Sequence, residues 1–310
     1  MGELAQAFGL TAGCEVSLEA NPDELAGVGA PAQALRDAGV TRLSIGVQSF
    51  NRGVLAVLGR SHDEATLETA IDAASRAGFA SLSCDLIFAA PGQDMAGWTS
   101  DLERATQAGF DHVSTYNLTY EEGTPLTGLR NVGRIAPATD SLERELYECA
   151  LEHFDERGFE HYEVSSFAKP GHRCRHNLAY WQWRDFLGLG AGAHGFARAE
   201  SGASGCGRRY ENHRAPADYM GARDGEWHAW QETIDTHAAI KELMLAGLRR
   251  IDGVEIATLR DVLGPDALSF YPRLDTLEAN GLLVSDEKHI QLTREGLLVA
   301  DSVIESLVSR

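Results

Sequence analysis

The chain of 310 residues has an apolar fraction of 44%, which is enough to bury the cores of one large and one small domain. Its formal net charge of −19 disfavours nucleic-acid backbones and anionic membranes as partners and is typical of a solvated acidic surface. No apolar run is long enough to cross a bilayer and the first residues lack the features of a signal peptide, so we expect a cytoplasmic protein that is not an integral membrane protein.

Four short apolar segments alternate with helical patterns in the first part of the chain, which is the spacing of a parallel βα barrel. Each segment ends in a polar residue, and at the carboxyl end of a barrel strand such a residue faces the ligand. Four βα units do not close a barrel, so we predict a small-molecule site at the mouth of an N-terminally incomplete α/β barrel. The strands are Val16–Leu18, Leu43–Val47, Leu82–Ile87 and Val113–Leu118, and the polar ends are Glu19, Gln48, Asp85 and Asn117–Glu121.

Helical patterns connect and follow these strands. One begins at the capping-box sequence Ser61–Glu64 and ends at Gly78, and another follows the turn Ala90–Gln93. Because parallel strands need crossover connections, these helices support a parallel sheet. Further helices are predicted over residues 30–38 and 139–158, and the helix after the turn places Trp98, Leu102 and Ala105 on one face.

The pattern changes in the second half of the chain. Residues 159–232 are rich in Gly, Arg, Trp and His and have weak periodicity. Residues 233–310 show a helix–helix–strand–strand–helix order that resembles a small winged-helix unit. We therefore predict a barrel-like domain over 1–232 and a winged-helix-like domain over 233–310. Within the latter, helices are predicted over 238–250, 256–263 and 269–280, a strand over 288–292, and a final helix capped by Thr293.

The five cysteines are too widely spaced for a metal-binding CxxC pair. An odd number of scattered cysteines is typical of unpaired thiols in a reducing compartment. They are Cys14, Cys84, Cys149, Cys174 and Cys206.

Seven motifs occur in chain order: Glu19–Pro22, Arg42–Phe50, Leu58–Arg60, Asp85–Ile87 with Pro91–Gln93, Tyr162–Phe167, His176–Trp181 and Gly190–His194. Together they resemble the HemW family of radical S-adenosylmethionine (SAM) heme chaperones, which is related to oxygen-independent coproporphyrinogen III oxidase. The resemblance runs from about Glu15 to near the C-terminus. It implies a partial radical-SAM (βα)6-type barrel, a C-terminal domain like that of the oxidase, and heme and SAM as ligands.

The sequence departs from the family pattern before its first strand. The family opens with a CxxxCxxC motif that holds a [4Fe–4S] cluster, followed by a Gly-Gly-Gly-Thr-Pro loop that contacts SAM, and neither is present here. The five cysteines cannot substitute, because three thiolates must converge on one cluster. We expect a start codon assigned too late, with a truncated form as the alternative. The cluster is then expected only in an N-terminally extended protein.

The resemblance implies that Glu19, Gln48, Arg60 and Asp85 contact SAM, and that Thr119 touches its nucleoside through the backbone. Carboxylates can hold ribose hydroxyls or an amino group, and a guanidinium pairs with a carboxylate. The alternative for the two carboxylates is a buried role between neighbouring strands. The alternative for the arginine is a surface residue at a helix start.

His176 is the candidate heme ligand, because imidazole suits heme iron and Tyr180 and Trp181 could cover a porphyrin face. The alternative is a loop held by hydrogen bonds from His176 and Asn177, with Trp181 in the core. His194 is a second candidate.

Two further features of this region have alternative readings. Cys174 could bond a porphyrin vinyl group, although no CxxCH motif supports this. The glycines of the following loop permit either close approach of a flat ligand or tight packing. They are Gly188, Gly190 and Gly192.

Three functions are compatible with these patterns. The first is a heme chaperone that delivers heme to an unknown acceptor protein, and the segments Gln48–Phe50 and His176–Trp181 favour it. The second is radical SAM oxidative decarboxylation of coproporphyrinogen III, which this chain cannot perform without cluster ligands. The third is a non-catalytic remnant that binds neither ligand.

Overall fold

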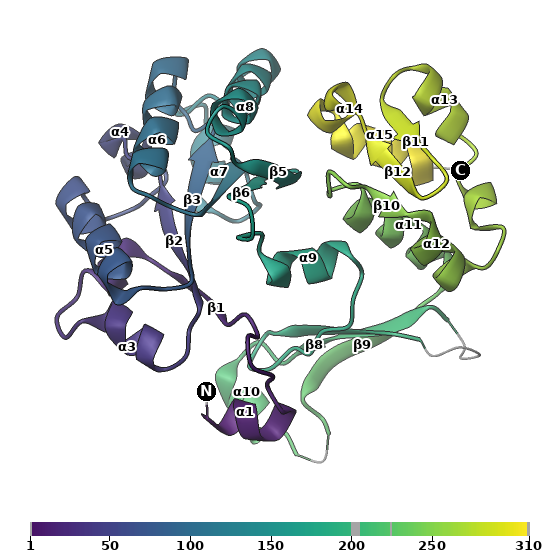
Figure 1. The fold of residues 1–310 in the computed structure, drawn as a ribbon, viewed down its shortest axis with the longest axis horizontal. Coiled ribbons are helices and arrows are strands. Elements are labelled where there is room, and N and C mark those ends of the chain that lie inside the picture. The colour runs from purple at the N-terminus through teal and green to yellow at the C-terminus, as the bar shows by residue number, and fades with distance from the viewer. Residues whose placement is uncertain (1, 200–204, 224, 309–310) are drawn as a thin grey trace. The chain divides into compact units, whose positions relative to one another are not determined.

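The computed structural model describes residues 2–199, 205–223 and 225–308, and the chain forms two compact units, residues 1–173 and 174–310 (Figure 1). Each unit has its own sheets and core. Residues 174–232, which the sequence analysis groups with the barrel, belong to the second unit by their packing. The domain boundary between residues 232 and 233 stays a prediction. No helix among the described residues is long and apolar enough to span a membrane.

The first unit is built on a six-stranded sheet with the order β1-β2-β3-β4-β6-β5. Its first four strands are parallel and overlap the four predicted ones. The motif Tyr162–Phe167 adds an antiparallel pair at the far edge. The strands are β1 (Ser17–Ala20), β2 (Arg42–Gln48), β3 (Ser81–Phe88), β4 (His112–Asn117), β5 (Glu160–Glu163) and β6 (Ser166–Ala168).

Helices cover one face of this sheet, and α5, α6 and α8 pack along β2 and β3 (Figure 1). Gly78 ends α5 in the left-handed conformation, as predicted. The predicted start is shifted, because the N-cap is Asp63, whose side chain accepts from the Thr66 N–H. The helices of the unit are α1 (Gly2–Phe8), α2 (Pro22–Leu25), α3 (Pro31–Asp37), α4 (Arg52–Val57), α5 (Glu64–Ala77), α6 (Met95–Gln107), α7 (Pro125–Asn131) and α8 (Asp140–Asp155).

The two faces of the sheet differ in polarity, because successive side chains of a strand point to opposite sides. The helix-facing side chains are apolar, and Phe88 of β3 contacts the buried Trp98 of α6 with ring centroids 5.7 Å apart. The other face is polar. There, Ser44 is hydrogen-bonded to Asp85, and Ser83 to His112. These strands are predicted as apolar segments, whereas only about every second residue of each strand is apolar.

The second unit begins with α9 (Arg175–Trp181) and a three-stranded antiparallel sheet of β7 (His194–Arg198), β8 (Gly207–Asn212) and β9 (His228–Ile234). A helix, α10 (Pro216–Gly221), connects β8 and β9.

The rest of the unit follows the predicted winged-helix-like order around its own apolar core. The predicted helix over 269–280 is wrong as one element. It is split at Tyr271 and Pro272, because a residue before proline is disfavoured in helical conformation. The final helix is likewise two helices. The elements are α11 (Thr236–Gly247), β10 (Val254–Glu255), α12 (Ile256–Leu263), the 3₁₀ turn η1 (Ala267–Phe270), α13 (Leu274–Ala279), β11 (Leu283–Ser285), β12 (His289–Leu292), α14 (Arg294–Leu298) and α15 (Ala300–Val308).

Candidate functional site

A row of hydrogen bonds crosses the polar face of the sheet in the middle of β2, β3 and β4. The Ser44 hydroxyl donates to Asp85 Oδ2 over 2.9 Å, and Ser114 is a second hydrogen-bond partner of this carboxyl group. Burial raises the pKa of Asp85 to about 6 despite these hydrogen bonds, and the charge of Glu19 contributes to the rise. Glu19 itself is exposed at the end of β1. The two predicted carboxylates therefore lie close enough to interact.

Gln48 lies at an irregular strand end. The β2–β3 register shifts between Ile45 and Gln48, and Gln48 has a φ of 65°. Its side chain turns back along the strand: a Cβ at Gly46 would lie 2.9 Å from Gln48 Nε2 and 3.8 Å from Asn21 Oδ1. Only glycine at position 46 leaves room for this amide beside Asn21.

Arg60 joins the same group through Asn21. Its Nη1 donates to Asn21 Oδ1 over 3.3 Å, although Arg60 is exposed. Asn21 is the N-cap of α2 and directly follows β1. Asn21 belongs to the motif Glu19–Pro22 but is not among the predicted site residues. Its position directly after a strand could have identified it as one.

Thr119 lies two residues after the end of β4. It is exposed in the loop after β4. Tyr116, two residues before the end of the predicted strand, interacts with the site together with Ser114 of the same strand. Desolvation raises the pKa of Tyr116 to about 12, and the charge of Asp85 adds to the rise. Tyr116 lies two residues after Ser114 and therefore on the same face of the strand.

The opposite ends of the strands are built from groups that already have partners. His112 Nδ1 lies 2.8 Å from the Ser83 hydroxyl, and its Nε2 lies 2.7 Å from the Tyr162 hydroxyl. Burial lowers the pKa of His112 to about 3, so the ring is neutral at physiological pH. Arg42 Nε donates to Glu15 over 3.0 Å. In βα barrels this end serves stability rather than chemistry.

His176 and Tyr180 lie on α9 of the second unit, and both side chains are exposed. The rings meet edge to face with centroids 4.9 Å apart, and Tyr180 meets Phe186 in the same way at 4.6 Å. The alternative that places Trp181 in the core is wrong, because Trp181 is half-buried and the buried tryptophan of this segment is Trp183.

His194 starts β7, and its exposed ring lies beside a buried carboxylate. Its Nε2 is 3.9 Å from Glu211 Oε1, and Glu211 Oε2 accepts from Trp230 Nε1 over 2.6 Å. The two histidines, both in the second unit, thus differ: His176 has the Tyr180 ring against it, whereas His194 has a carboxylate beside it as well as the Trp230 ring, with centroids 6.1 Å apart.

The glycine-rich loop before β7 is held by side chains of the unit. Gly188 is required by packing, because a Cβ there would lie 2.3 Å from the His194 carbonyl oxygen. Gly190 has open space, a Cβ at Gly192 would make only ordinary contacts with Arg214, and both have positive φ, so backbone conformation requires them. Cys174 is 6% exposed, which disfavours a thiol that meets a ligand.

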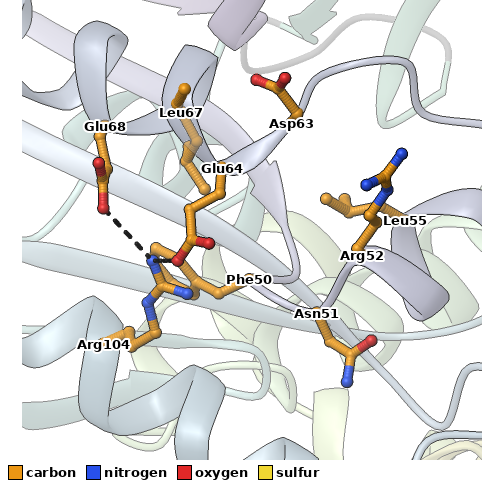
Figure 2. Close-up of a pocket in the computed structure, with 10 residues that line it drawn as sticks. Phe50, Asn51, Arg52, Leu55, Asp63, Glu64, Leu67, Glu68 and Arg104 are labelled. Carbon is orange, nitrogen blue, oxygen red and sulfur yellow. Dashed lines mark ion pairs between the residues drawn. The ribbon is translucent and has the colours of Figure 1, made fainter.

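A cavity of about 820 Å³ lies on the helix side of the first unit (Figure 2). Arg104 pairs there with Glu64 over 2.8 Å, and its guanidinium lies 4.7 Å from the centroid of the Phe50 ring. None of the predicted site residues lines it. The candidate site is therefore the hydrogen-bonded group at the strand ends rather than this cavity.

The described residues do not fit an iron–sulfur cluster. None of the five cysteines forms a disulfide, and no group of three or more His, Cys, Asp or Glu in the described part of the chain could hold a metal ion. A [4Fe–4S] cluster needs converging thiolates. The polar groups of the candidate site are of the kind that binds a small polar ligand, namely the Asp85 carboxyl group, the Gln48 amide and the exposed Glu19 carboxylate.

Comparison with known proteins matches both halves of the chain to family models. The model of the Radical SAM superfamily matches residues 2–119, and that of the HemN C-terminal domain matches residues 234–299. Three curated relatives carry the name heme chaperone HemW. The Lactococcus lactis protein is 30% identical over 95% of this chain and 75% of its own length. The Bacillus subtilis protein is 32% identical over 93% and 74%, and a Mycobacterium tuberculosis protein is 33% identical over 97% and 73%.

A solved structure shares the fold. Coproporphyrinogen III oxidase (HemN) from Escherichia coli, a radical SAM enzyme, superposes with a TM-score of 0.75 at 21% sequence identity. The match covers 99% of this chain and 72% of that one. At this identity the likeness supports the α/β radical SAM fold alone.

Proposed function

Because this chain belongs to the HemW family of radical SAM proteins, we propose that it binds heme and delivers it to an acceptor protein. The observation that carries the proposal is the exposed His176 on α9, with Tyr180 against its ring. An imidazole can ligate heme iron, and flat aromatic side chains can pack against a porphyrin.

Exposure suits a chaperone, because a ligand that must pass to another protein has to be reachable by it. A heme bound at His176 would keep one face open to an acceptor. His194 is the second candidate, with Glu211 as the carboxylate neighbour that often orients a metal-binding histidine.

The strand ends of the first unit are proposed as the SAM site. Asp85 and Glu19 would accept from ribose hydroxyls or an amino group, Gln48 would offer an amide, and Arg60 would pair with a carboxylate. Thr119 is proposed to contact the nucleoside through its backbone. When bound with a cluster, SAM supplies radical chemistry. The described cysteines do not form a cluster site.

The cytoplasm is the proposed location. The five cysteines, none of which forms a disulfide, support a reducing compartment.

A heme titration followed by Soret absorbance tests the proposal. The parent chain is expected to give a saturable one-to-one shift that His176→Ala loses. His237→Ala is the matched control, because it removes an exposed histidine from another helix of the same unit. Loss in His194→Ala instead would assign the ligand to His194. A folded chain that gives no shift would contradict heme binding by this protein.

A further inference from the structure

Two strand ends beside the candidate site have left-handed residues that are not glycine. Gln48 is the last residue of β2 and has a φ of 65°, and Ala89 follows β3 with a φ of 62°. The Ser49 N–H donates to the Val47 carbonyl over 2.8 Å, which makes Gln48 the centre of a three-residue turn. Turns of this kind with positive φ at the centre are rare and strained. Such a conformation persists only where the surroundings hold it.

The group that holds the first of these turns is Asp101, in the middle of α6. Its Oδ2 accepts from the Ser49 hydroxyl over 2.6 Å, and its Oδ1 accepts from the Phe50 N–H over 2.8 Å. The Ser49 hydroxyl in turn accepts from the Asn51 N–H over 3.0 Å. The carboxylate therefore bonds the two residues that follow Gln48.

Asp101 also reaches the loop after β3. Gln93 is a third hydrogen-bond partner of its carboxyl group. Gln93 is itself tied to the end of β3, because its Oε1 accepts from the Ala90 N–H over 3.3 Å. The Asp101 side chain thus joins the motif segments Gln48–Phe50 and Pro91–Gln93. Of the residues in these segments, only Gln48 is a proposed ligand contact, so ligand binding does not explain the others.

Nothing within α6 itself explains an aspartate at position 101. Asp101 is 1% exposed, lies far from both ends of α6 and does not cap it. Aspartate is a poor helix former, and burial raises its pKa, which reflects the cost of an ionised group in this place. That cost is offset by the three donors that face the carboxylate.

We propose that Asp101 is a positioning residue that fixes the loops after β2 and β3 and so aims the Gln48 side chain into the ligand site. It acts from the helix side of the sheet and touches no ligand. The proposal rests on the proposed function in one respect, namely that Gln48 contacts SAM.

Two measurements on the full chain test the proposal with Asp101→Asn. The variant keeps the shape of the side chain but leaves one acceptor oxygen for three donors. Amide hydrogen exchange at Phe50 is expected to accelerate about tenfold, because exchange reports local opening. The dissociation constant for SAM, measured by equilibrium dialysis, is expected to rise about tenfold, while that for heme stays unchanged.

Asp94→Asn is the matched control, because it removes the same charge from the same helix and asparagine retains the N-cap. It should leave both readouts at parent values. Ser49→Ala is the milder second variant. It removes only the hydroxyl donor, and its effect should be non-additive with Asp101→Asn.

Unchanged Phe50 exchange in the Asp101 and Ser49 variants would overturn the proposal. Faster exchange at Phe50 with unaltered SAM affinity would also overturn it, because the orientation of the Gln48 side chain would then not depend on Asp101. A parent chain that binds no SAM would refute the proposed SAM site, and the exchange measurement would still decide whether Asp101 holds the loops.

Discussion

The strand ends of the first unit and the α9 segment of the second unit present their polar groups in different ways. In the first unit, Asp85 is held by hydrogen bonds to two serines, and Gln48 is buried in a backbone turn with positive φ. On α9, His176 and Tyr180 are exposed and rest on ring contacts. A preorganised site favours a ligand that is kept in one geometry, whereas an exposed one favours a ligand that is handed on.

The largest effect is expected from the buried scaffold beneath the first site. Arg42→Ala removes the ion pair with Glu15 and the hydrogen bond from Nη2 to the His172 carbonyl, which measures 2.6 Å. Breaking a buried ion pair costs about 3–5 kcal/mol. Calorimetry should show a large fall in the unfolding temperature of the first unit. Arg76→Ala, which removes an exposed pair with Asp72, should cost less than about 1 kcal/mol. Equal effects would contradict the buried role of Arg42.

The second-largest effect is expected in the pH dependence of the stability of the first unit. His112 has a pKa lowered by burial to about 3, against 6.5 for the free side chain. Its contribution to stability is therefore present above pH 6.5 and is lost as the pH falls toward 3. Between pH 6.5 and 5 the loss should be about 2 kcal/mol, on the basis of 1.4 kcal/mol per pH unit.

Urea unfolding of the parent and His112→Gln at the two pH values measures this difference. The variant should be less stable at neutral pH and should lack the histidine contribution to the acid sensitivity. The same pH dependence in both proteins would show that His112 does not carry it.

A smaller effect is expected at the first site itself. Asp85→Asn should weaken SAM binding about tenfold and leave heme binding unchanged, because the neutral amide still fits between the serines but lacks the charge. Since burial raises the pKa of Asp85 to about 6, the parent should also lose SAM affinity as the pH falls through 6. Equilibrium dialysis at pH 5 and 7.5 measures both. A variant with the same pH profile as the parent would argue against Asp85.

The smallest effect is expected on the exposed segment. Tyr180→Leu keeps an apolar side chain but removes the ring that contacts His176 and Phe186. Aromatic pairs contribute about 1 kcal/mol beyond buried area, so heme should bind about fivefold more weakly. SAM affinity should not change. A Soret titration beside the SAM assay measures both, and a joint loss of the two affinities would contradict the separation of the sites.

Local patterns in the sequence predict much of the fold. The four parallel strands, the end of α5 at Gly78 and the bounds of α12 follow from period, caps and breakers within a few residues. The motifs also mark Glu19, Gln48 and Asp85 at strand ends. The contacts among these residues, and their support by Asp101, do not follow from such patterns.

What the sequence alone determined is therefore the position of each strand, most helices and the strand-end residues that form a candidate site. The tertiary structure decided which of them meet. Arg60 and Asn21 are 39 residues apart, and Ser49 and Asp101 are 52 apart. It also placed residues 174–232 in the second unit. The physical reason is that periodicity and capping act within a few residues, whereas distant side chains become partners only after strand register and helix packing bring them together.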